Sequence, residues 1–384
     1  MIERVASHKV LEMAKKFPVI LLTGPRQSGK TTLCRNIFPD YKYVSLENPD
    51  NLYFAESDPK GFLSLYDKHV VIDEAQNCPS LFSYIQQVVD ESNLSGQYIL
   101  TGSQNFLLLE KISQSLAGRV YIMELLPFSQ QEISLKNWHE ALLKGGYPRI
   151  FDKDIAPNDY FPNYIQTYIE RDVRNIINVQ DLSLFQKFLY LLAHHVGQLI
   201  NFNRISKELG VDIKTVQRWF SILEASYIVF TLKPWHKNFA KRLVKTPKLY
   251  FYDTGIVAFL LGVESKENLL LSKYKGALFE NFGVNDIIRT YKNNGLRHPF
   301  YFWRDSNGNE IDFIIDQGNK VKLIEMKASE TVKSEFIKSL HYLDNQLNNF
   351  DIKHYLLNAI NTSQPRTNET ILSWNNVSSL IDEH

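Results

Sequence analysis

Short apolar runs alternate with amphipathic stretches between about residue 18 and residue 126. The runs are rich in Val, Ile, Leu and Tyr, which favour strands, and the stretches between them have helical spacing. The expected strands cover residues 19–23, 43–46, 70–73, 98–101 and 120–125. Nearly continuous apolar strands separated by helices are typical of a parallel sheet covered on both faces. The pattern therefore predicts an α/β domain at the start of the chain.

The pattern becomes mainly helical between about residues 136 and 255, with helices at 185–196 and 211–223 and a strand pair near 228–232 and 249–252. A third pattern follows residue 262. It comprises a helix at 274–291, strands at 300–304, 310–315 and 321–326, another helix, and a strand near 354–357. These changes predict three parts: the α/β domain at 1–135, a mainly helical part at 136–260, and a C-terminal α/β part at 261–384.

Composition narrows the class of protein without naming a function. At about 150 residues per domain, 384 residues predict two to three domains. A hydrophobic fraction of 44% and a charged fraction of 22% are ordinary for globular chains and exclude a disordered or disulfide-built protein. The 43 Lys and Arg residues nearly balance the 42 Asp and Glu residues, so any nucleic-acid surface must be a local patch.

The sequence pattern predicts neither a targeting segment nor a membrane span. The first residues, Met1 to Arg4, carry an acid and no long apolar core follows, and nowhere do about 18 apolar residues run together. The two cysteines, Cys34 and Cys78, lack the spacing of a metal or redox motif, which fits a reducing compartment. We expect a soluble cytoplasmic protein with no membrane partner.

A phosphate-binding loop follows the first expected strand. Residues 24–31 spell GPRQSGKT and precede a helical run. Glycines allow backbone N–H groups to surround phosphates, the Lys30 amine reaches the β and γ oxygens, and the Thr31 hydroxyl holds Mg²⁺. ATP and Mg²⁺ are therefore the predicted cofactors. The predicted binding residues are Gly24, Pro25, Arg26, Gln27, Ser28, Gly29, Lys30, Thr31, Thr32 and Asp73.

Two carboxylates end the expected strand at 70–73. Asp73 is predicted to complete the Mg²⁺ shell with Thr31, and Glu74 to orient or deprotonate the attacking water. A nucleotide switch that only binds can dispense with Glu74, so its presence predicts hydrolysis, in which Lys30 also acts. Arg119, before the fifth strand, is a candidate for neutralising transition-state charge in cis or across a subunit interface, although a surface role explains it equally well.

These motifs resemble a family of prokaryotic AAA+-superfamily ATPases with a C-terminal domain of unknown function. Besides the loop and the Asp73–Glu74 pair, the resemblance rests on residues 101–103, 116–119, 126–129, 145–148, 168–172, 248–255 and 310–313. It covers nearly the whole chain. The resemblance implies an ATPase sheet of strand order 5-1-4-3-2, a helical lid at 136–180, a winged helix-turn-helix at 181–260 and a restriction-endonuclease-like α/β fold at 261–384.

The middle of the chain has a helix-turn-helix pattern at residues 202–220. Gly210 marks the turn and Asp212 caps the second helix. Side chains suited to phosphates and base edges follow the cap, and a basic stretch without acids lies beyond it. The first group is Lys214, Thr215, Gln217 and Arg218, and the second is Lys233, Lys237, Lys241, Arg242, Lys245 and Lys248. DNA contact is predicted here, with docking to a protein as the alternative.

The C-terminal part contains the acid, acid and Glu-x-Lys pattern of PD-(D/E)XK nucleases. Its members are Glu280 on a helix, Asp312 on one strand, and Glu325 and Lys327 on the next. Alternate strand residues share a face, so Glu325 and Lys327 are expected to point together beside Asp312. Asp312 and Glu325 are predicted to hold Mg²⁺, and Lys327 to stabilise or deprotonate the hydrolytic water. Cleavage of DNA is chemically feasible, but such folds also persist as binding scaffolds.

Two classes of function remain open from the sequence. The first is an ATP hydrolase that acts on DNA through the winged helix and the nuclease-like domain. The alternative is a nucleotide-switched signalling or scaffold ATPase with an inactive nuclease-like domain and a protein partner. A helicase ranks third, because residues 73–76 resemble a DEAx box but no second motor domain follows. A homo-oligomer is left open.

Overall fold

The computed structural model describes residues 2–103, 115–169, 182–236, 244–344, 347 and 349–381. The chain divides into two compact units. Unit 1 comprises residues 1–127, 225–227 and 292–295, and unit 2 comprises the rest. Among the helices of the described residues, none has both the length and the apolar character that a membrane crossing requires.

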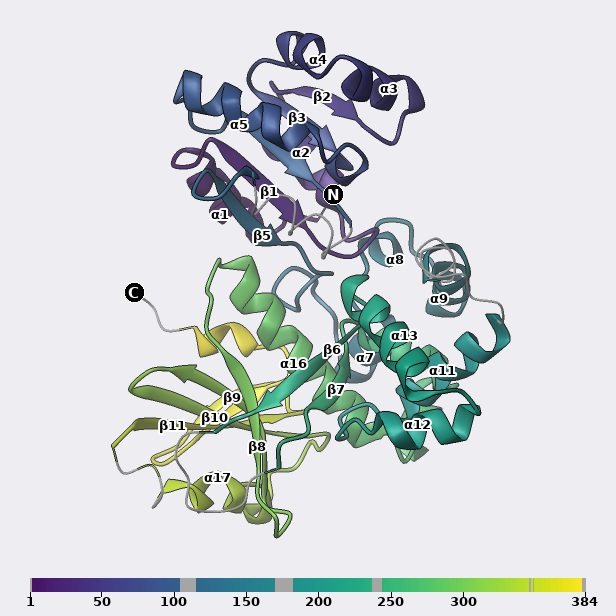
Figure 1. Cartoon of the computed structure of the whole chain (residues 1–384). Helices are drawn as coiled ribbons and strands as arrows, with labels where there is room; N and C mark the ends of the chain where they lie inside the picture. Colours follow the sequence, from purple (N-terminus) through teal and green to yellow (C-terminus); the bar gives the residue numbers. More distant parts are fainter. Residues whose placement is uncertain are drawn as a thin grey trace. The chain divides into compact units, whose positions relative to one another are not determined.

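Unit 1 contains a five-stranded parallel sheet of order β2-β3-β4-β1-β5 (Figure 1), which is 5-1-4-3-2 from the other edge. Each strand expected at 19–125 is found, with bounds shifted by at most one residue. The elements are α1 (Ala6–Ala14), β1 (Val19–Thr23), α2 (Lys30–Ile37), β2 (Lys42–Ser45), α3 (Pro49–Ser57), α4 (Pro59–Leu65), β3 (Val70–Asp73), a 3₁₀ turn (Ala75–Asn77), α5 (Leu81–Ser92), β4 (Tyr98–Thr101) and β5 (Val120–Glu124).

Helices cover both faces of this sheet, because successive strand residues point to opposite sides. Val19 and Leu21 of β1 pack with side chains of α4 and α5. Ile20 and Leu22 pack instead with α1 and α2. All five residues of β1 are buried, as the nearly continuous apolar run predicts. The carboxyl ends of the strands, where both predicted motifs begin, are thus held by two hydrophobic layers.

Unit 2 begins with helices. They are α7 (Trp138–Lys144), α8 (Pro148–Asp152), α9 (Pro157–Tyr164) with a π-helical turn (Ile165–Ile169), α11 (Leu182–His194), α12 (Phe202–Leu209), α13 (Ile213–Ala225), α14 (Thr254–Leu260), α15 (Lys266–Leu271) and α16 (Lys275–Asn293). Between α12 and α13, Gly210 has the left-handed conformation that ends a helix without strain. The predicted helix-turn-helix is therefore present as a local geometry.

An eight-stranded sheet of order β12-β13-β11-β10-β9-β8-β6-β7 forms the other half of unit 2 (Figure 1). Parallel pairing of β6 with β8 joins the strand pair of the middle region to the C-terminal strands. The sequence analysis assigned these strands to separate parts. The elements are β6 (Val229–Pro234), β7 (Lys248–Phe251), β8 (Phe300–Arg304), β9 (Glu310–Gln317), β10 (Lys320–Lys327), a 3₁₀ turn (Ser334–Phe336), α17 (Lys338–Tyr342), β11 (Asp351–Asn358), β12 (Gln364–Pro365), β13 (Thr370–Ser373) and a 3₁₀ turn (Val377–Leu380).

The central strands β9 and β10 are covered on both faces. Each has six consecutive buried residues. On one face, Leu340 of α17 and the following Leu343 pack in a cluster with Val321 and Leu323. On the other face, Gly283 of α16 lies so close that an added Cβ atom would be 2.6 Å from Met326 Sδ. Helices on both faces hold the functional candidates of β9 and β10 in place.

Candidate functional site

The loop between β1 and α2 has the backbone that phosphate binding requires. Gly24 and Gly29 have φ of 141° and 92°, a region that side chains rarely tolerate. A Cβ atom on Gly24 would lie 2.3 Å from the carbonyl oxygen of Leu125. The chain therefore needs glycine at this position, and α2 begins directly after Gly29 with its free N–H groups at the loop.

Lys30 is 6% exposed and lies against the loop. Its amine donates hydrogen bonds to the carbonyl oxygens of Gly24 at 3.0 Å and Pro25 at 2.8 Å. Burial lowers the pKa of Lys30 to about 8, although the nearby acids Glu74 and Asp73 act in the other direction. The buried hydroxyl of Ser28 has no hydrogen-bond partner among the described residues. A charged amine and an unpartnered hydroxyl in one loop fit an anionic ligand.

The predicted metal residues of unit 1 meet directly. The Thr31 hydroxyl donates to the Asp73 carboxylate, with 3.0 Å to each oxygen. Tyr43 donates to the same carboxylate at 2.7 Å, and Thr101 contacts its other oxygen. Burial and this bond to a carboxylate raise the pKa of Tyr43 to about 12. A hydroxyl beside a carboxylate at the start of a helix suits Mg²⁺ next to phosphates.

Glu74 stands at the end of β3 in a left-handed conformation with φ of 54°, which is uncommon for a residue with a side chain. Its carboxylate accepts hydrogen bonds from Ser103 at 3.1 Å and from Gln76. Its backbone N–H donates to the Thr101 hydroxyl at 3.3 Å. Three residues thus fix the orientation of the acid.

The remaining predicted loop residues lie around this centre. Pro25 is buried, Arg26 and Gln27 are half-buried, and Thr32 is exposed on the first turn of α2. Two further residues that the sequence pattern does not indicate contribute to the loop and its metal residues. Arg4 donates to the carbonyl oxygens of Ser28 and Leu126, each at 2.7 Å, and the other is Tyr43. No spacing rule links such distant residues to the loop, so only the folded chain identifies them.

Arg119 lies away from the nucleotide loop within its own chain. It precedes β5, whose first residue Val120 pairs with Val19, whereas the loop follows the other end of β1. Five strand residues at about 3.3 Å each separate the two ends by roughly 16 Å. Arg119 instead pairs with Asp90 of α5 at 2.5 and 2.8 Å. Arg119 therefore lies at the amino end of β5, a position that does not favour the role in cis, and the role across a subunit interface stays a prediction.

The second helix of the helix-turn-helix is capped as predicted. The Asp212 carboxylate accepts from the backbone N–H groups of Lys214 at 2.8 Å and Thr215 at 3.0 Å. Lys214, Gln217 and Arg218 are exposed, so the predicted contact side chains face solvent. The helix-turn-helix thus presents polar and basic groups on one element.

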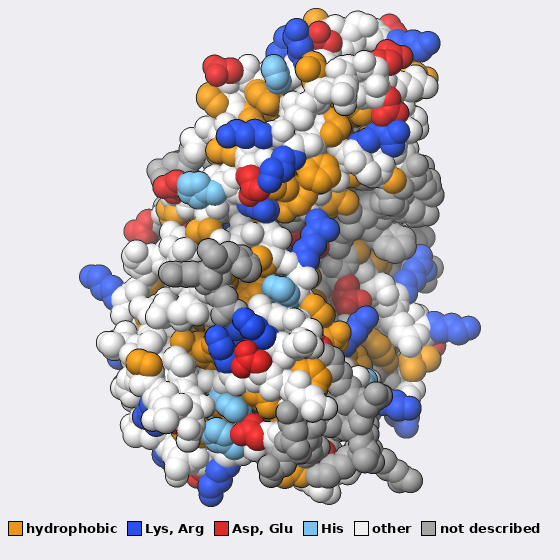
Figure 2. All heavy atoms as spheres, turned by 90° about the vertical axis from the view of Figure 1, so that its left-hand side faces the viewer, with side chains coloured by type: hydrophobic (Ala, Val, Ile, Leu, Met, Phe, Trp, Pro, Cys, Tyr) orange, Lys and Arg blue, Asp and Glu red, His pale blue; other side chains and the backbone are white. Residues whose placement is uncertain are grey.

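The predicted basic stretch is less continuous in the structure. Lys237, Lys241 and Arg242 lie outside the described residues. Lys248 is buried, so its assignment to a cationic surface is wrong. Lys233 and Lys245 line a cavity of about 580 Å³ together with Trp235 and His236. On the face shown in Figure 2, Lys and Arg side chains lie among Asp and Glu side chains rather than in one continuous patch.

The four predicted residues of the C-terminal site gather on α16, β9 and β10. Asp312 accepts a hydrogen bond from the backbone N–H of Met326 at 2.8 Å, and its carboxylate is 3.5 Å from the Lys327 amine. Lys327 also pairs with Glu325 at 2.5 Å. Oxygen atoms of Glu280, Glu310 and Asp312 lie within 4.8 Å of one another. Glu310, which was not among the predicted site residues, is two residues from Asp312 and therefore on the same face of β9.

A buried lysine lies between two of these carboxylates. Lys248 of β7 has a side chain that is 2% exposed, and its amine pairs with Glu280 at 2.8 Å and with Glu310. Tyr250 also donates to Glu280, at 2.5 Å. Burial alone would lower the pKa of Lys248, but the surrounding acids raise it well above its usual value. The lysine therefore supplies the positive charge that a metal would otherwise supply to these two carboxylates.

Glu325 lies beside Asp312 and Lys327 in this group. One of its carboxylate oxygens is buried and lacks a hydrogen bond of ordinary geometry among the described residues, although Ser339 is close enough to lower the pKa of the group. Burial and the neighbouring charge of Asp312 raise the pKa of Glu325 to about 8. Lys327 opposes this shift. Asp312, Glu325 and Lys327 thus have the mutual geometry that the Glu-x-Lys pattern predicts.

Family models match three consecutive segments of the chain. An AAA domain covers residues 16–134, a domain of unknown function (DUF8612) covers residues 135–267, and a second one (DUF4143) covers residues 275–377. Residues 170–172, part of one stretch on which the family resemblance rests, lie outside the described residues.

Several known proteins are similar to this chain. It is 31% identical over 336 residues to "Uncharacterized protein Rv2008c" of Mycobacterium tuberculosis, covering 85% of this chain and 74% of that protein. An uncharacterized protein of Haemophilus influenzae is 22% identical over 85% of each chain. The solved Walker-type ATPase PABY2304 of Pyrococcus abyssi has a TM-score of 0.44 and 16% identity, covering 67% of this chain and 94% of that one.

The parallel sheet, the phosphate loop and the paired acids define the first part of the chain as a P-loop ATPase domain of the AAA class. The chain belongs to the family of the mycobacterial protein Rv2008c, and it joins this AAA domain to two domains of unknown function.

Proposed function

We propose that this protein hydrolyses ATP with Mg²⁺ and acts on DNA through its helix-turn-helix and C-terminal domain. The observation that carries the ATPase part is the contact of Thr31 with Asp73 beside the oriented Glu74. Lys30 and the backbone of residues 24–29 bind the phosphates, and Thr31 and Asp73 hold Mg²⁺, which when bound stabilises charge on phosphoryl oxygens. Glu74 orients or deprotonates water as a general base.

Contact with DNA is supported by the helix-turn-helix. Lys214, Gln217 and Arg218 are exposed near the start of α13, the end that recognition helices present to a major groove. The nearly balanced charge of the whole chain requires such a local surface. A winged-helix role for α11 to β7 is part of this proposal.

The C-terminal group supports a nuclease-like site with Asp312 and Glu325 as metal ligands and Lys327 as the group that stabilises or deprotonates water. The observation that supports it is the cluster of two buried carboxylates with the Lys327 amine 3.5 Å from Asp312 and 2.5 Å from Glu325. Glu280 already accepts hydrogen bonds from Lys248 and Tyr250. Its proposed role is therefore to hold these two side chains in place beside the site.

The alternative proposal is a nucleotide-switched signalling or scaffold ATPase with an inactive nuclease-like domain and a protein partner. The observation that favours it is the buried amine of Lys248 between Glu280 and Glu310. An internal ammonium group satisfies these carboxylates without a divalent metal.

Cleavage of DNA separates the two proposals. Plasmid and single-stranded DNA are incubated with Mg²⁺, with and without ATP, using the wild type and Asp312→Ala. Cleavage by the wild type that is lost in Asp312→Ala supports the DNA-acting enzyme. ATP hydrolysis without cleavage or DNA binding by the pure wild type contradicts it and favours the scaffold. Glu335→Ala, an exposed acid of the same domain, is the matched control.

A further inference from the structure

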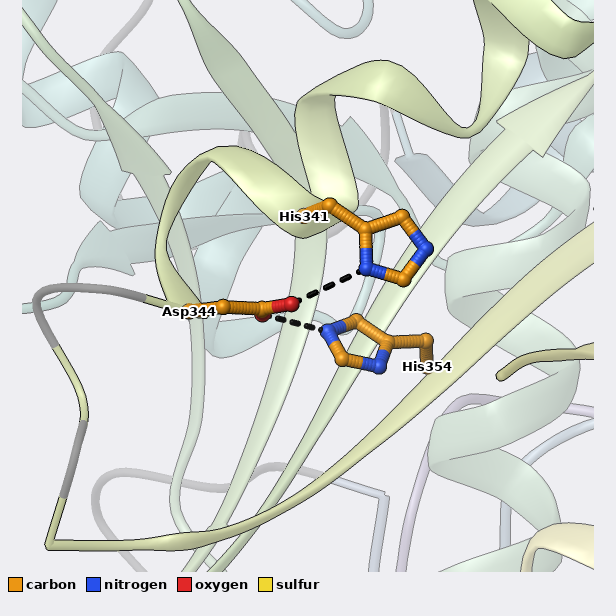
Figure 3. A group of neighbouring side chains, drawn as sticks. All are labelled: His341, Asp344 and His354. Atoms are coloured by element: carbon orange, nitrogen blue, oxygen red, sulfur yellow. Dashed lines mark hydrogen bonds and ion pairs between the residues drawn. The ribbon is translucent and has the colours of Figure 1, made fainter. Parts of the chain in front are cut away.

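Two histidines and an aspartate meet at the surface of the C-terminal sheet, apart from every residue assigned above. The Asp344 carboxylate is 2.9 Å from His341 Nδ1 and 2.7 Å from His354 Nε2. Figure 3 shows that both rings turn a nitrogen toward this carboxylate. One donor atom from each of the three residues lies within 4.8 Å of the others.

We propose that His341, Asp344 and His354 form a binding site for a divalent transition-metal ion of the Zn²⁺ class. Imidazole nitrogens with one carboxylate oxygen are a donor set that Zn²⁺ takes, whereas Mg²⁺ and Ca²⁺ prefer oxygen alone. Bonds of about 2.0 Å to a tetrahedral ion place donor atoms about 3.3 Å apart. The two histidine–carboxylate separations, which run to different oxygens of Asp344, are 0.4 to 0.6 Å shorter, so the side chains must rotate apart to admit the ion.

The fold fixes these donors from two elements. His341 is on α17 and Asp344 follows three residues later, a spacing that places both on one side of a helical turn. Leu340 and Leu343, next to them in sequence, are fully buried in the core and anchor this turn. His354 extends from β11. A metal ion here links α17 to the sheet.

A second carboxylate stands behind one of the imidazoles. Glu369 Oε2 lies 3.7 Å from His341 Nε2, the nitrogen that faces away from Asp344. Metal-binding histidines commonly direct their other nitrogen to a carboxylate, which fixes the ring and its tautomer. The 3.7 Å separation is an ion-pair distance rather than a hydrogen bond, and the other oxygen of Glu369 lies 3.7 Å from Arg366, so Glu369 must turn toward His341 to support it. Glu369 is thus the residue positioned to orient the His341 ring when a metal ion is bound.

Access from solvent is open on one side of the group. The side chains of His341 and Asp344 are 35% and 36% exposed, whereas that of His354 is 10% exposed. The three protein ligands leave a fourth tetrahedral position that water can fill. The site therefore exchanges metal without unfolding of the sheet.

Calorimetric titration tests the site. The full chain without a purification tag is treated with a chelator, exchanged into buffer, and titrated with ZnCl₂ while excess Mg²⁺ occupies oxygen-only sites. We expect one saturable Zn²⁺ per chain and loss of this binding in the double variant His341→Asn/His354→Asn. Glu369→Gln is expected to bind about 10- to 100-fold more weakly.

His195→Asn serves as the matched control. His194 and His195 are also neighbouring imidazoles, but their ring nitrogens contact Tyr274 and Gln198 rather than a carboxylate. The variant should bind Zn²⁺ as the wild type does. A wild type without saturable binding, or a double variant that binds equally well, overturns the proposal.

Co²⁺ provides a measurement that needs no variant. A Co²⁺ ion held by two imidazoles and a carboxylate in tetrahedral geometry absorbs visible light far more strongly than hydrated Co²⁺. We expect this absorption in the wild type and its disappearance on addition of Zn²⁺. A spectrum that matches hydrated Co²⁺ contradicts the proposal even if the double variant fails to fold.

Discussion

At the residue scale, the nucleotide site depends on a few side chains whose orientation is fixed by neighbours. Glu74 has a strained backbone and a carboxylate held by Ser103. Asp73 is shared by Thr31 and Tyr43. Pre-orientation of this kind is typical of catalytic groups, because reactive side chains must not reorganise during the reaction.

Replacing Glu74 by Gln should keep ATP binding and lower the turnover number about 10²- to 10⁴-fold. The amide retains a similar shape but cannot accept a proton from water. Fluorescent-nucleotide binding and phosphate release measure the two effects separately. The control is Glu56→Gln, an exposed acid of α3, which should turn over as the wild type does. Unchanged turnover in Glu74→Gln contradicts the assigned role.

Gly24→Ala should abolish nucleotide binding. The new methyl group would lie 2.3 Å from the Leu125 carbonyl oxygen, and the backbone has φ of 141°, so the loop must move. Nucleotide titration and thermal unfolding measure the losses of affinity and stability. Gly276→Ala is the control, because nothing lies within 4 Å of its added Cβ atom on α16 and alanine favours helices by about 1 kcal/mol. Normal nucleotide affinity in Gly24→Ala would show that the loop adapts.

The buried carboxylate of Glu325 predicts a pH dependence. Its pKa in the folded chain is about 8, above the ordinary value of 4.5, so the folded state keeps a proton that the unfolded state releases between these values. Stability should therefore fall as the pH rises from about 4.5 to 8. Glu325→Gln removes this contribution, so urea unfolding at pH 5.5 and 8 should differ less in the variant than in the wild type. The exposed Glu335→Gln should retain the wild-type difference.

At the element scale, the helix-turn-helix depends on its cap. Asp212 satisfies two backbone N–H groups and one hydroxyl at the start of α13. Its substitution leaves these donors to water and frees the first turn, which carries the proposed DNA contacts.

Asp212→Ala should lower the free energy of unfolding by about 1 kcal/mol and weaken DNA binding. Urea unfolding and fluorescence anisotropy with a DNA duplex measure the two effects. Glu208→Ala is the control, because its exposed ion pair with Arg204 contributes only about 0.3–0.5 kcal/mol. Equal stabilities of the two variants would exclude a significant cap.

At the scale of the whole molecule, each unit carries its own chemistry. The nucleotide residues belong to unit 1, whereas the helix-turn-helix contact residues, the acidic group and the histidine site belong to unit 2. Each unit has its own core, so a polar substitution in one should leave the folding of the other largely intact.

Lys327→Ala tests this independence. ATP turnover should remain near that of the wild type, because the ion pairs of the Lys327 amine among the described residues are with Asp312 and Glu325 of the same unit. Any Mg²⁺-dependent DNA cleavage should be lost. Phosphate release and plasmid nicking are the measurements. A collapse of ATP turnover would instead show that the C-terminal domain supports the ATPase unit structurally.

The pattern of the sequence was sufficient for the strands and motifs of unit 1, whereas α1 was not predicted. Alternation and apolar runs located all five strands, and the loop spacing placed Thr31 beside Asp73, 42 residues later in the chain. This works because parallel strands share their carboxyl edge, so local motifs on neighbouring strands must meet. Glu325 and Lys327 were equally predictable, since strand alternation places them on one face.

Residues that act through long-range contacts could be found only in the folded chain. Arg4, Tyr43 and Glu310 entered the sites through tertiary packing, and Lys248 moved from an expected surface to a buried ion pair. The same holds for His341, Asp344 and His354, which join a helix to a strand.

The sequence by itself determined the strand and helix pattern, the phosphate loop and the acids that follow β3, because periodicity and motif spacing are local properties of the chain. Only the tertiary structure decided which charges pair. It also placed Arg119 at the amino end of β5, away from the phosphate loop, and joined β6 and β8 in one sheet. The physical reason is that burial and ion pairing depend on distances between residues remote in sequence, which local patterns do not encode.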